Sequence, residues 1–403
     1  MRSPNVLFVS TYGAKCGIST YTEQLVDGCR SLNTGSSIGV LAEDEGYSTD
    51  PLVEYAWNRS SLDYQALLSE ILKNKYDSYD VVHFQHEYGL FGGLEEFANC
   101  VHQLRLRGRK VYVTMHTVHP AIRRHPGEWV SSTGDARVLR FLAKNSYIIV
   151  HSYGCKDALE SVGCDSDKIL VIQHGTQASK QIHSTEYCRK LLGIPLGCTV
   201  SLTFGFIGEG KKQIEIARVV DFMSRAHFNN TLKCVIAGTP HEHDRSGKEY
   251  ADKLTKELES LPNVILIDRF VDDVQIPILY GATDFSILGS ARTPFGISGR
   301  SHLELAYGRL IIAEAVRLHD DLTGRSLMYS TPIELQWAVY QAVAFSGCAN
   351  IQYLIDSAIN FAEETRWSKI AGKHMAAYAM RHGPGVSLRR AREKIARLIG
   401  RRD

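Results

Sequence analysis

Residues 5–20 read NVLFVSTYGAKCGIST, an apolar run that ends in a turn containing Gly13 and Gly17. An apolar run without in/out alternation is typical of a strand covered on both faces, as in a parallel sheet flanked by helices. Apolar residues at helical spacing follow over 21–31. The stretch therefore predicts a strand, a glycine turn and a helix, the opening unit of an α/β domain.

The same alternation continues through the first half of the chain. A second helix is expected at 61–72. Further short apolar runs predict strands at 37–41, 80–84, 110–115, 147–151 and 169–172.

The pattern then restarts after 187–199, where Gly193, Pro195 and Gly197 interrupt it. Helices are expected at 212–225, 248–261, 301–307 and 331–345, and strands at 200–206, 232–237, 263–267, 283–288 and 310–313. Two successive series predict two parallel sheets in two Rossmann-like domains. We expect domains at 1–190 and 191–375, followed by a C-terminal helix in 376–403.

Composition excludes several classes of protein. The 403 residues are 44% hydrophobic and 22% charged, as in a globular protein, and a net charge of +2 gives no field for nucleic acid. The nine cysteines are odd in number and have no CxxC spacing, which disfavours a zinc site or disulfides and favours a reducing cytoplasm. No signal peptide or membrane span is expected.

Polar residues gather where two strands of the first half end. The stretch 81–93 reads VVHFQHEYGLFGG and contains His86 and Glu87, and 113–120 reads VTMHTVHP and contains His116. Ligands of open α/β sheets bind at the carboxyl ends of the strands. We therefore interpret His86, Glu87 and His116 as candidate site residues, although a single such histidine can also be a satisfied core group.

The second half has two segments suited to an anion. The stretch 204–212, FGFIGEGKK, places Gly208 before Lys211 and Lys212, and 298–304, SGRSHLE, opens a helix. Helix N-terminal amides and basic side chains bind phosphates. The candidates are Gly208, Lys211, Lys212, Ser298, Gly299, Arg300 and Glu304; the alternatives are solvated lysines and a plain capped helix.

The last residues differ in character. SLRRAREKIARLIGRR at 387–402 is a basic amphipathic pattern. It predicts either a solvated surface helix or an electrostatic contact with an anionic membrane at the inner face.

The order of these segments resembles the retaining GT-B-fold glycosyltransferases of family 4. The resemblance runs over nearly the whole chain, and its most specific stretches are GISTYTEQL (17–25), VVHFQHEYGLFGG (81–93), TMHTVHP (114–120), KILVIQHGT (168–176), LTFGFIGEGKK (202–212), ILIDRFVDDVQIPILYGATDFSIL (265–288), PFGISGRSHLELAYGRLIIA (294–313) and WSKIA (367–371). It implies two Rossmann-like domains whose parallel sheets face across a cleft, and a final helix that crosses back onto the N-terminal domain.

The resemblance also implies roles for matched positions. Gly17 and Lys211 would lie near the donor diphosphate, and His116 near the transferred sugar. The 298–304 stretch would hold the distal phosphate, sugar and ribose, and Arg269 joins the donor-binding set. Glu87 and His86 would face the acceptor.

Two departures from the family pattern stand out. Phe206 occupies the position of a common arginine, for which Lys212 or Arg300 can substitute. Phe295 and Leu303 occupy the slots of a common Glu-x7-Glu pair, and Glu304 is one position away. A catalytically inactive sugar-nucleotide binder or accessory protein is therefore the alternative. An epimerase, a glycan phosphorylase and, more weakly, a dehydrogenase are further rivals.

The expected reaction transfers a sugar from GDP-mannose or a UDP-sugar to a hydroxyl acceptor, with retention. No DxD pair stands at a matching site. We expect no metal and no cofactor apart from the nucleotide-sugar co-substrate.

Overall fold

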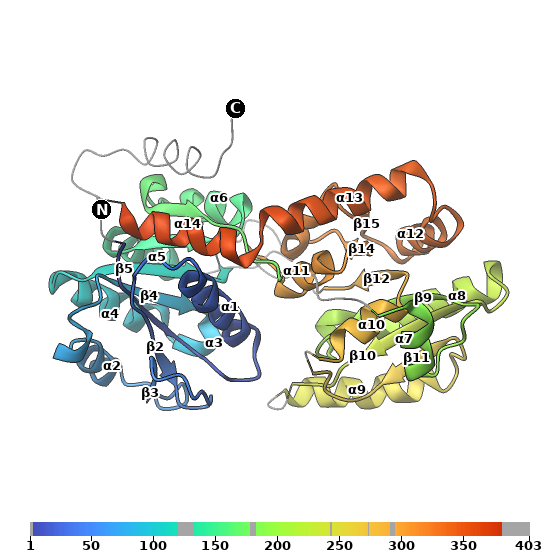
Figure 1. Ribbon diagram of the computed structural model, residues 1–403, viewed down its shortest axis with the longest axis horizontal. Helices are drawn as coiled ribbons and strands as arrows, with labels where there is room; N and C mark the ends of the chain where they lie inside the picture. Colours follow the sequence, from blue (N-terminus) through green and yellow to red (C-terminus); the bar gives the residue numbers. More distant parts are fainter. Residues whose placement is uncertain are drawn as a thin grey trace. The chain divides into compact units, whose positions relative to one another are not determined.

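The computed structural model describes residues 3–119, 133–177, 183–241, 244–272, 274–290 and 295–380. The chain forms two compact units (Figure 1). Unit 1 comprises 1–175, 294–299 and 365–403, and unit 2 comprises 176–293 and 300–364.

The described part of unit 1 is built on a parallel sheet with strand order β3-β2-β1-β4-β5-β7-β8. The strands are β1 (Val6–Ser10), β2 (Ile38–Glu43), β3 (Val53–Trp57), β4 (Val81–His86), β5 (Lys110–Met115), β7 (Tyr147–Val150) and β8 (Ile169–Val171). The order reverses beside β1, so the ends of β1 and β4 diverge at a switch point, where α/β sheets bind ligands.

Helices cover both faces of this sheet (Figure 1). One apolar core lies under α2 (Tyr64–Ile71), α4 (Leu94–Leu106), α5 (Thr133–Asn145) and α6 (Tyr153–Ser161), and the other lies under α1 (Gly17–Ser31) and α14 (Trp367–Ala379). Smaller elements are α3 (Tyr88–Phe91), the 3-10 turns η1 (Asn74–Tyr76) and η2 (Ser166–Lys168), and an antiparallel pair of β6 (Thr117–Val118) with β13 (Phe295–Gly296).

The last described helix, α14, lies beside α1 in unit 1 (Figure 1). Trp367, Ile370, Ala371 and Tyr378 recur at helical spacing and are buried against it. The approach is close: a Cβ on Gly28 would stand 3.0 Å from the Ala371 Cβ. The chain thus returns to unit 1 through α14, most of which lies in the expected second domain; the helix expected in 376–403 lies mostly outside the described residues.

Unit 2 repeats the design with the strand order β11-β10-β9-β12-β14-β15, all neighbours being parallel. Its strands are β9 (Thr199–Phe204), β10 (Leu232–Ala237), β11 (Val264–Ile267), β12 (Phe285–Leu288), β14 (Leu310–Glu314) and β15 (Leu327–Tyr329). Its helices are α7 (Thr185–Leu192), η3 (Glu209–Lys211), α8 (Gln213–His227), α9 (Arg245–Leu258), α10 (Ile276–Ala282), α11 (Gly299–Ala306, which starts at the end of unit 1), η4 (Arg317–Leu322), α12 (Pro332–Ala344) and α13 (Ala349–Glu364).

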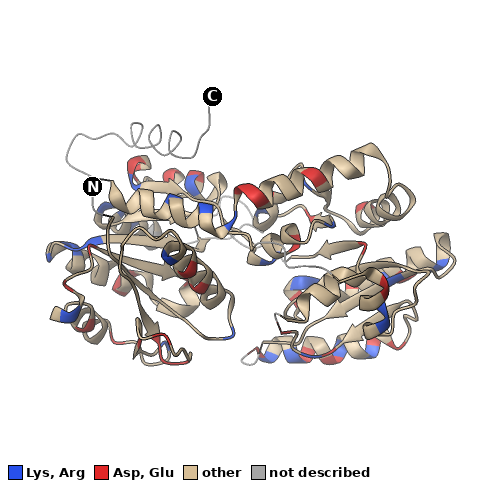
Figure 2. Ribbon diagram, viewed as in Figure 1, with Lys and Arg blue, Asp and Glu red and all other residues tan. Residues whose placement is uncertain are grey.

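Solvated faces of unit 2 carry charges of both signs. Along α9 basic and acidic side chains alternate (Figure 2), and Arg245 pairs with Glu249 at 3.2 Å. A mixed surface of this kind favours solubility and gives no stripe of one sign.

The units differ from the expected domains at two places. Helix α7 lies within the predicted first domain, but it packs in unit 2, where the Arg189 guanidinium donates to Asp284 at 2.7 Å. Residues 365–380 belong to unit 1 because α14 packs on α1. The predicted basic helix at 387–402 lies outside the described residues.

Candidate functional site

Lys211 is a half-buried cation without a compensating anion among the described residues. It ends the turn η3, which follows β9, and its ammonium has no ion-pair or hydrogen-bond partner among the described residues. Burial and the charge of Arg300 lower its pKa to about 8. A desolvated ammonium beside a second cation is a site of positive potential that an anion would stabilise.

Arg300 comes from the first turn of α11 and is held in place by its own helix. Its Nε lies 3.4 Å from Oε1 of Glu304, one turn further along, and the Glu304 side chain is fully buried. Burial raises the pKa of Glu304, whereas the charge of Arg300 lowers it. Glu304 therefore orients Arg300, and its contact with a donor hydroxyl stays a prediction.

His319 is a neighbour of this cationic pair that the sequence did not reveal. Its Nδ1 donates to the Glu314 carbonyl at 2.9 Å. Burial lowers its pKa, the Glu314 hydrogen bond and the charge of Asp321 oppose this, and the charges of Lys211 and Arg300 lower it as well. The ring is thus neutral, with Nε2 left as an acceptor. It lies in RLHDDL at 317–322, where no glycine turn draws attention to it.

The other predicted donor residues of unit 2 have different surroundings. Lys212 forms an ion pair with Glu314, so its charge is compensated. Gly208 caps η3 in an extended conformation. Arg269 is exposed after β11. Of the predicted basic residues, Lys211 and Arg300 are therefore the pair that the fold brings together.

In unit 1, Gly17 is the first residue of α1, and no heavy atom lies within 4 Å of the position of a Cβ on it. The N–H groups of Gly17 and Ile18 have no partner among the described residues. Cys16 caps the helix, its Sγ accepting from the Ser19 N–H at 3.4 Å. Free amides at a helix N-terminus under open space are suited to an anion.

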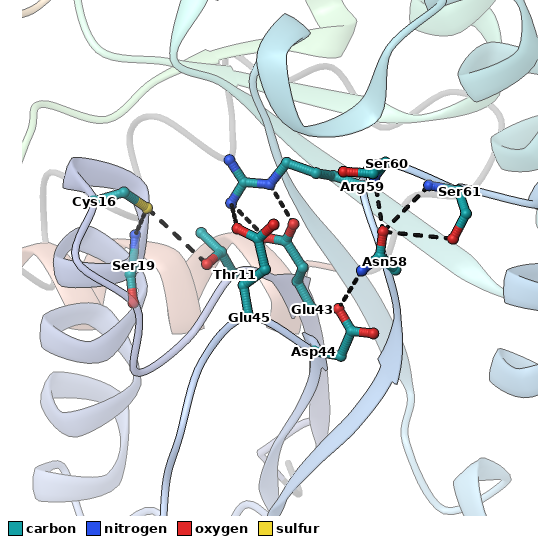
Figure 3. A network of polar contacts seen from close by, with 10 residues as sticks. All are labelled: Thr11, Cys16, Ser19, Glu43, Asp44, Glu45, Asn58, Arg59, Ser60 and Ser61. Carbon is teal, nitrogen blue, oxygen red and sulfur yellow. Dashed lines mark hydrogen bonds and ion pairs between the residues drawn. The ribbon is translucent and has the colours of Figure 1, made fainter. Parts of the chain in front are cut away.

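The loop before α1 is rigidly held. Gly13 has a φ of +69°, and a Cβ on it would stand 2.1 Å from the Tyr47 carbonyl oxygen. Beside the loop, Arg59 donates to both carboxylate oxygens of the buried Glu43 and lies 3.3 Å from Glu45 (Figure 3). The loop therefore forms part of a pre-organised sheet edge.

The structure places His86 in an aromatic core. Its side chain is fully buried, 4.6 Å from the Phe97 ring between centroids, and neither ring nitrogen has a partner among the described residues. Burial lowers its pKa to about 3. His86 is therefore neutral, and this placement gives no support to it as an acceptor-facing group.

Glu87 is tied to its neighbours. Its carboxylate accepts from the Tyr88 N–H at 3.1 Å and from the Thr117 hydroxyl at 2.8 Å. Burial raises the pKa of Glu87, and these hydrogen bonds lower it. The carboxylate caps α3 at the carboxyl edge of β4.

His116 is almost fully buried just after β5. Its Nε2 lies 3.0 Å from Oε1 of Gln85, and its Nδ1 lies 3.4 Å from Nε2 of His151. Burial and then His151 hold its pKa well below the usual range, so the ring is neutral.

In the same unit, Gly299 approaches His174: a Cβ on Gly299 would stand 3.2 Å from Nε2 of that histidine. Gln85 and His174 lie in the stretches 81–93 and 168–176 that the sequence marked out, but they were not among the predicted site residues. His151 ends a predicted strand and was not predicted as a site residue either. Ser298 directly precedes α11.

Three further observations on the described residues concern metal ligands, cysteines and membrane-spanning helices. They contain no cluster of three or more His, Cys, Asp or Glu side chains that could bind a metal ion. The nine cysteines are free thiols. Within the described ranges, no helix has the length and apolar character needed to cross a bilayer.

Residues 17–180 match the family model described as Glycosyltransferase Family 4. No curated protein sequence matches the chain.

Several solved structures have the same fold. HepE of Anabaena, in complex with UDP and glucose, aligns with a TM-score of 0.69 at 15% identity, covering 94% of this chain and 100% of that chain. A glycosyltransferase from Rickettsia africae aligns with a TM-score of 0.71 at 15% identity, covering 93% and 98%. Sucrose-phosphate synthase from Thermosynechococcus elongatus gives 0.68 at 15%, also covering 93% and 98%.

These findings define the class: the chain has the GT-B fold of glycosyltransferases, with two parallel-sheet units. More particularly, the match over 17–180 confirms the resemblance to glycosyltransferase family 4. At 15% identity the structural likeness itself shows the fold alone.

Proposed function

We propose that this protein transfers a sugar from a nucleoside-diphosphate sugar to a hydroxyl acceptor, with retention at the anomeric carbon. The observation that carries the proposal is the uncompensated charge of Lys211 beside Arg300. Such a pair fits a diphosphate, which is the leaving group of this reaction.

The proposed sugar transfer depends mainly on stabilising the charges that develop in the transition state. As the bond to the sugar breaks, positive charge develops on the sugar and negative charge on the diphosphate. In unit 2, Lys211 and Arg300 would hold that negative charge. In unit 1, the free amides of Gly17 and Ile18 have the same chemical suitability for an anion. Because side-chain cations and helix amides can supply this stabilisation, the proposed transfer needs no metal ion.

HepE, which shares the fold, is seen with UDP and glucose. A UDP-sugar is therefore the first donor to test, with GDP-mannose as the alternative. The acceptor would be a hydroxyl of a glycan, a lipid-linked sugar or a small molecule. A contact of 387–402 with an anionic membrane remains part of the proposal.

The direct test is the affinity of Lys211→Ala for UDP-glucose and GDP-mannose, measured by calorimetry. A hydrogen bond to a charged group contributes roughly 1.5–3 kcal/mol, so the dissociation constant should rise about 10- to 100-fold. Lys256→Ala removes the same charge from the exposed face of α9 and should leave the affinity unchanged. Equal affinity of Lys211→Ala and wild type would remove the diphosphate assignment.

A second candidate function is a catalytically inactive sugar-nucleotide binder. Glu304, the acidic residue nearest to the family's usual pair, is buried and turned to Arg300. Saturable donor binding with no transfer to a panel of acceptors and no slow hydrolysis would favour this function. Product formation would exclude it, and the anomeric configuration of the product would test retention.

A further inference from the structure

A chain of buried polar side chains crosses the core of unit 1 from α14 to the carboxyl edge of the sheet. The described residues that form it are all at most 9% exposed. They are Tyr21, His374, Tyr378, His83, Gln85, His116 and His151.

The edge of the sheet begins the chain of contacts. Nδ1 of His151 lies 3.0 Å from the carbonyl oxygen of Ile172, and its Nε2 lies 3.4 Å from Nδ1 of His116. Nε2 of His116 lies 3.0 Å from Oε1 of Gln85.

Helix α14 ends the chain of contacts. Nε2 of Gln85 lies 3.5 Å from Nε2 of His83, and Nδ1 of His83 is 2.5 Å from the Tyr378 hydroxyl. That hydroxyl lies 3.2 Å from Nδ1 of His374, whose Nε2 is 3.5 Å from the Tyr21 hydroxyl. The Thr114 hydroxyl, 2.8 Å from Nε2 of His83, can accept there as well.

The carbonyl at one end fixes the direction of these hydrogen bonds. A carbonyl oxygen only accepts, so Nδ1 of His151 carries the proton. The His151 ring is 3% exposed, and burial disfavours a second proton that would charge it. With one N–H, Nε2 of His151 accepts and Nδ1 of His116 donates. Nε2 of His116 is then bare, and a bare nitrogen cannot pair with the Gln85 Oε1 that lies 3.0 Å from it. The hydrogen-bond network therefore assigns the Gln85 amide the orientation turned by 180°, in which its NH2 donates to Nε2 of His116.

The donors and acceptors between Gln85 and α14 follow from the same reasoning. In the turned orientation the oxygen of Gln85, instead of its Nε2, faces His83. Nε2 of His83 then donates, and its Nδ1 accepts from the Tyr378 hydroxyl. Tyr378 in turn accepts from Nδ1 of His374, whose Nε2 accepts from Tyr21. Burial lowers the pKa of His83 to about 3 and those of His116 and His374 well below the usual range, so each ring has one proton to place.

We infer that His151, Gln85 and the α14 residues Tyr378 and His374 are positioning residues that hold His116 as the Nδ1–H tautomer. His116 then presents Nε2 as a hydrogen-bond acceptor. A sugar hydroxyl that reaches His116 must donate its proton in place of Gln85. This last step rests on the proposed function, whereas the tautomer pattern does not.

The pattern is testable by long-range proton–nitrogen NMR of the 15N-histidine-labelled full chain. His116, His151 and His374 should each show a protonated Nδ1 and a bare Nε2, and His83 should show the reverse. Tyr378→Phe removes one hydroxyl from the chain and should redistribute the tautomers of His83 and His374. Tyr112→Phe is the matched control, because its hydroxyl also contacts α14, donating to the Ala377 carbonyl at 2.6 Å, but lies outside the chain of contacts.

A protonated Nε2 on His116 in the wild type would overturn the inference, and so would a Tyr378→Phe spectrum with the wild-type pattern. For the sugar step, donor analogues with single hydroxyls replaced by fluorine are compared by calorimetry. Fluorine cannot donate, so one analogue should bind at least about 10-fold more weakly to wild type and not more weakly to His116→Ala. No such analogue would refute the acceptor role, whereas no binding of the parent donor would instead refute the proposed function.

Discussion

At Lys211 a single side chain combines burial, a lowered pKa and the absence of a carboxylate partner among the described residues. Desolvation disfavours the ammonium in the free protein, and a bound anion would relieve that penalty. The cost of keeping the charge is consistent with a residue selected for binding rather than for stability.

The pH dependence of donor binding follows from this residue. The pKa of Lys211 is lowered to about 8, so its charge is present below that pH and is lost as the pH rises above it. We expect affinity for a nucleotide-sugar to fall between pH 7 and pH 9. Lys211→Arg keeps its charge throughout this range and should flatten the profile. A wild-type dissociation constant that is equal at the two pH values would contradict the expectation.

Two glycines of one loop should behave differently when replaced by alanine. Gly13→Ala places a Cβ at a φ of +69° and 2.1 Å from the Tyr47 carbonyl oxygen, so the free energy of unfolding should fall by about 2 kcal/mol or more. Gly17→Ala meets open space and should leave stability within about 0.5 kcal/mol, while it weakens donor binding. Denaturant titration and calorimetry separate the two effects; equal losses of stability would refute the distinction.

At the scale of elements, α14 completes the core of the first unit. Trp367 contacts Tyr21 at 5.0 Å between ring centroids and is 8% exposed. Trp367→Ala should lower the free energy of unfolding by about 3–5 kcal/mol. Trp337 on α12 is 58% exposed, and Trp337→Ala should cost less than about 1 kcal/mol. Urea titration of both variants measures these losses of unfolding free energy. Similar losses would contradict the assignment of the Trp367 contribution to its burial.

Elements that carry a long apolar run were predictable from the sequence. The spans of β5 and β10 agree with the predicted 110–115 and 232–237. Strands β3 and β15 were missed because the first is mostly half-buried at an edge and the second has three residues, so neither shows a run of buried positions. The first-unit membership of α7 was wrong, since a helix pattern does not reveal which sheet the helix packs on.

The candidate site was predictable where chemistry lies next to a strand end. Lys211 and Arg300 were found in this way, because glycine turns and basic residues mark phosphate sites in sequence. His86 shows where prediction from the sequence fails. The side-chain alternation along β4 places His86 in the aromatic core, and its being a polar residue next to Glu87 does not reveal which face of the sheet it occupies.

At the scale of the whole molecule, neutral buried histidines make stability depend on acid. The pKa values of His83 and His86 are lowered to about 3 by burial. Between pH 6.5 and 3 the unfolded chain binds protons that the folded chain does not, so stability is lost as the pH falls. Each ring should cost about 2 kcal/mol between pH 7 and pH 5.

Urea unfolding at pH 7 and pH 5 measures this slope. His86→Leu removes one such ring, which has no hydrogen-bond partner among the described residues, and should make the slope shallower. A slope identical to that of wild type would mean that His86 does not titrate on unfolding.

The chain enters the first unit three times, through 1–175, 294–299 and 365–403. Neither unit is therefore encoded by one continuous stretch of the gene, so neither can be exchanged as a single fragment. A chimera that borrows its amino-terminal half from a relative must also borrow the closing helix from that same relative, or its histidine core will face a foreign surface.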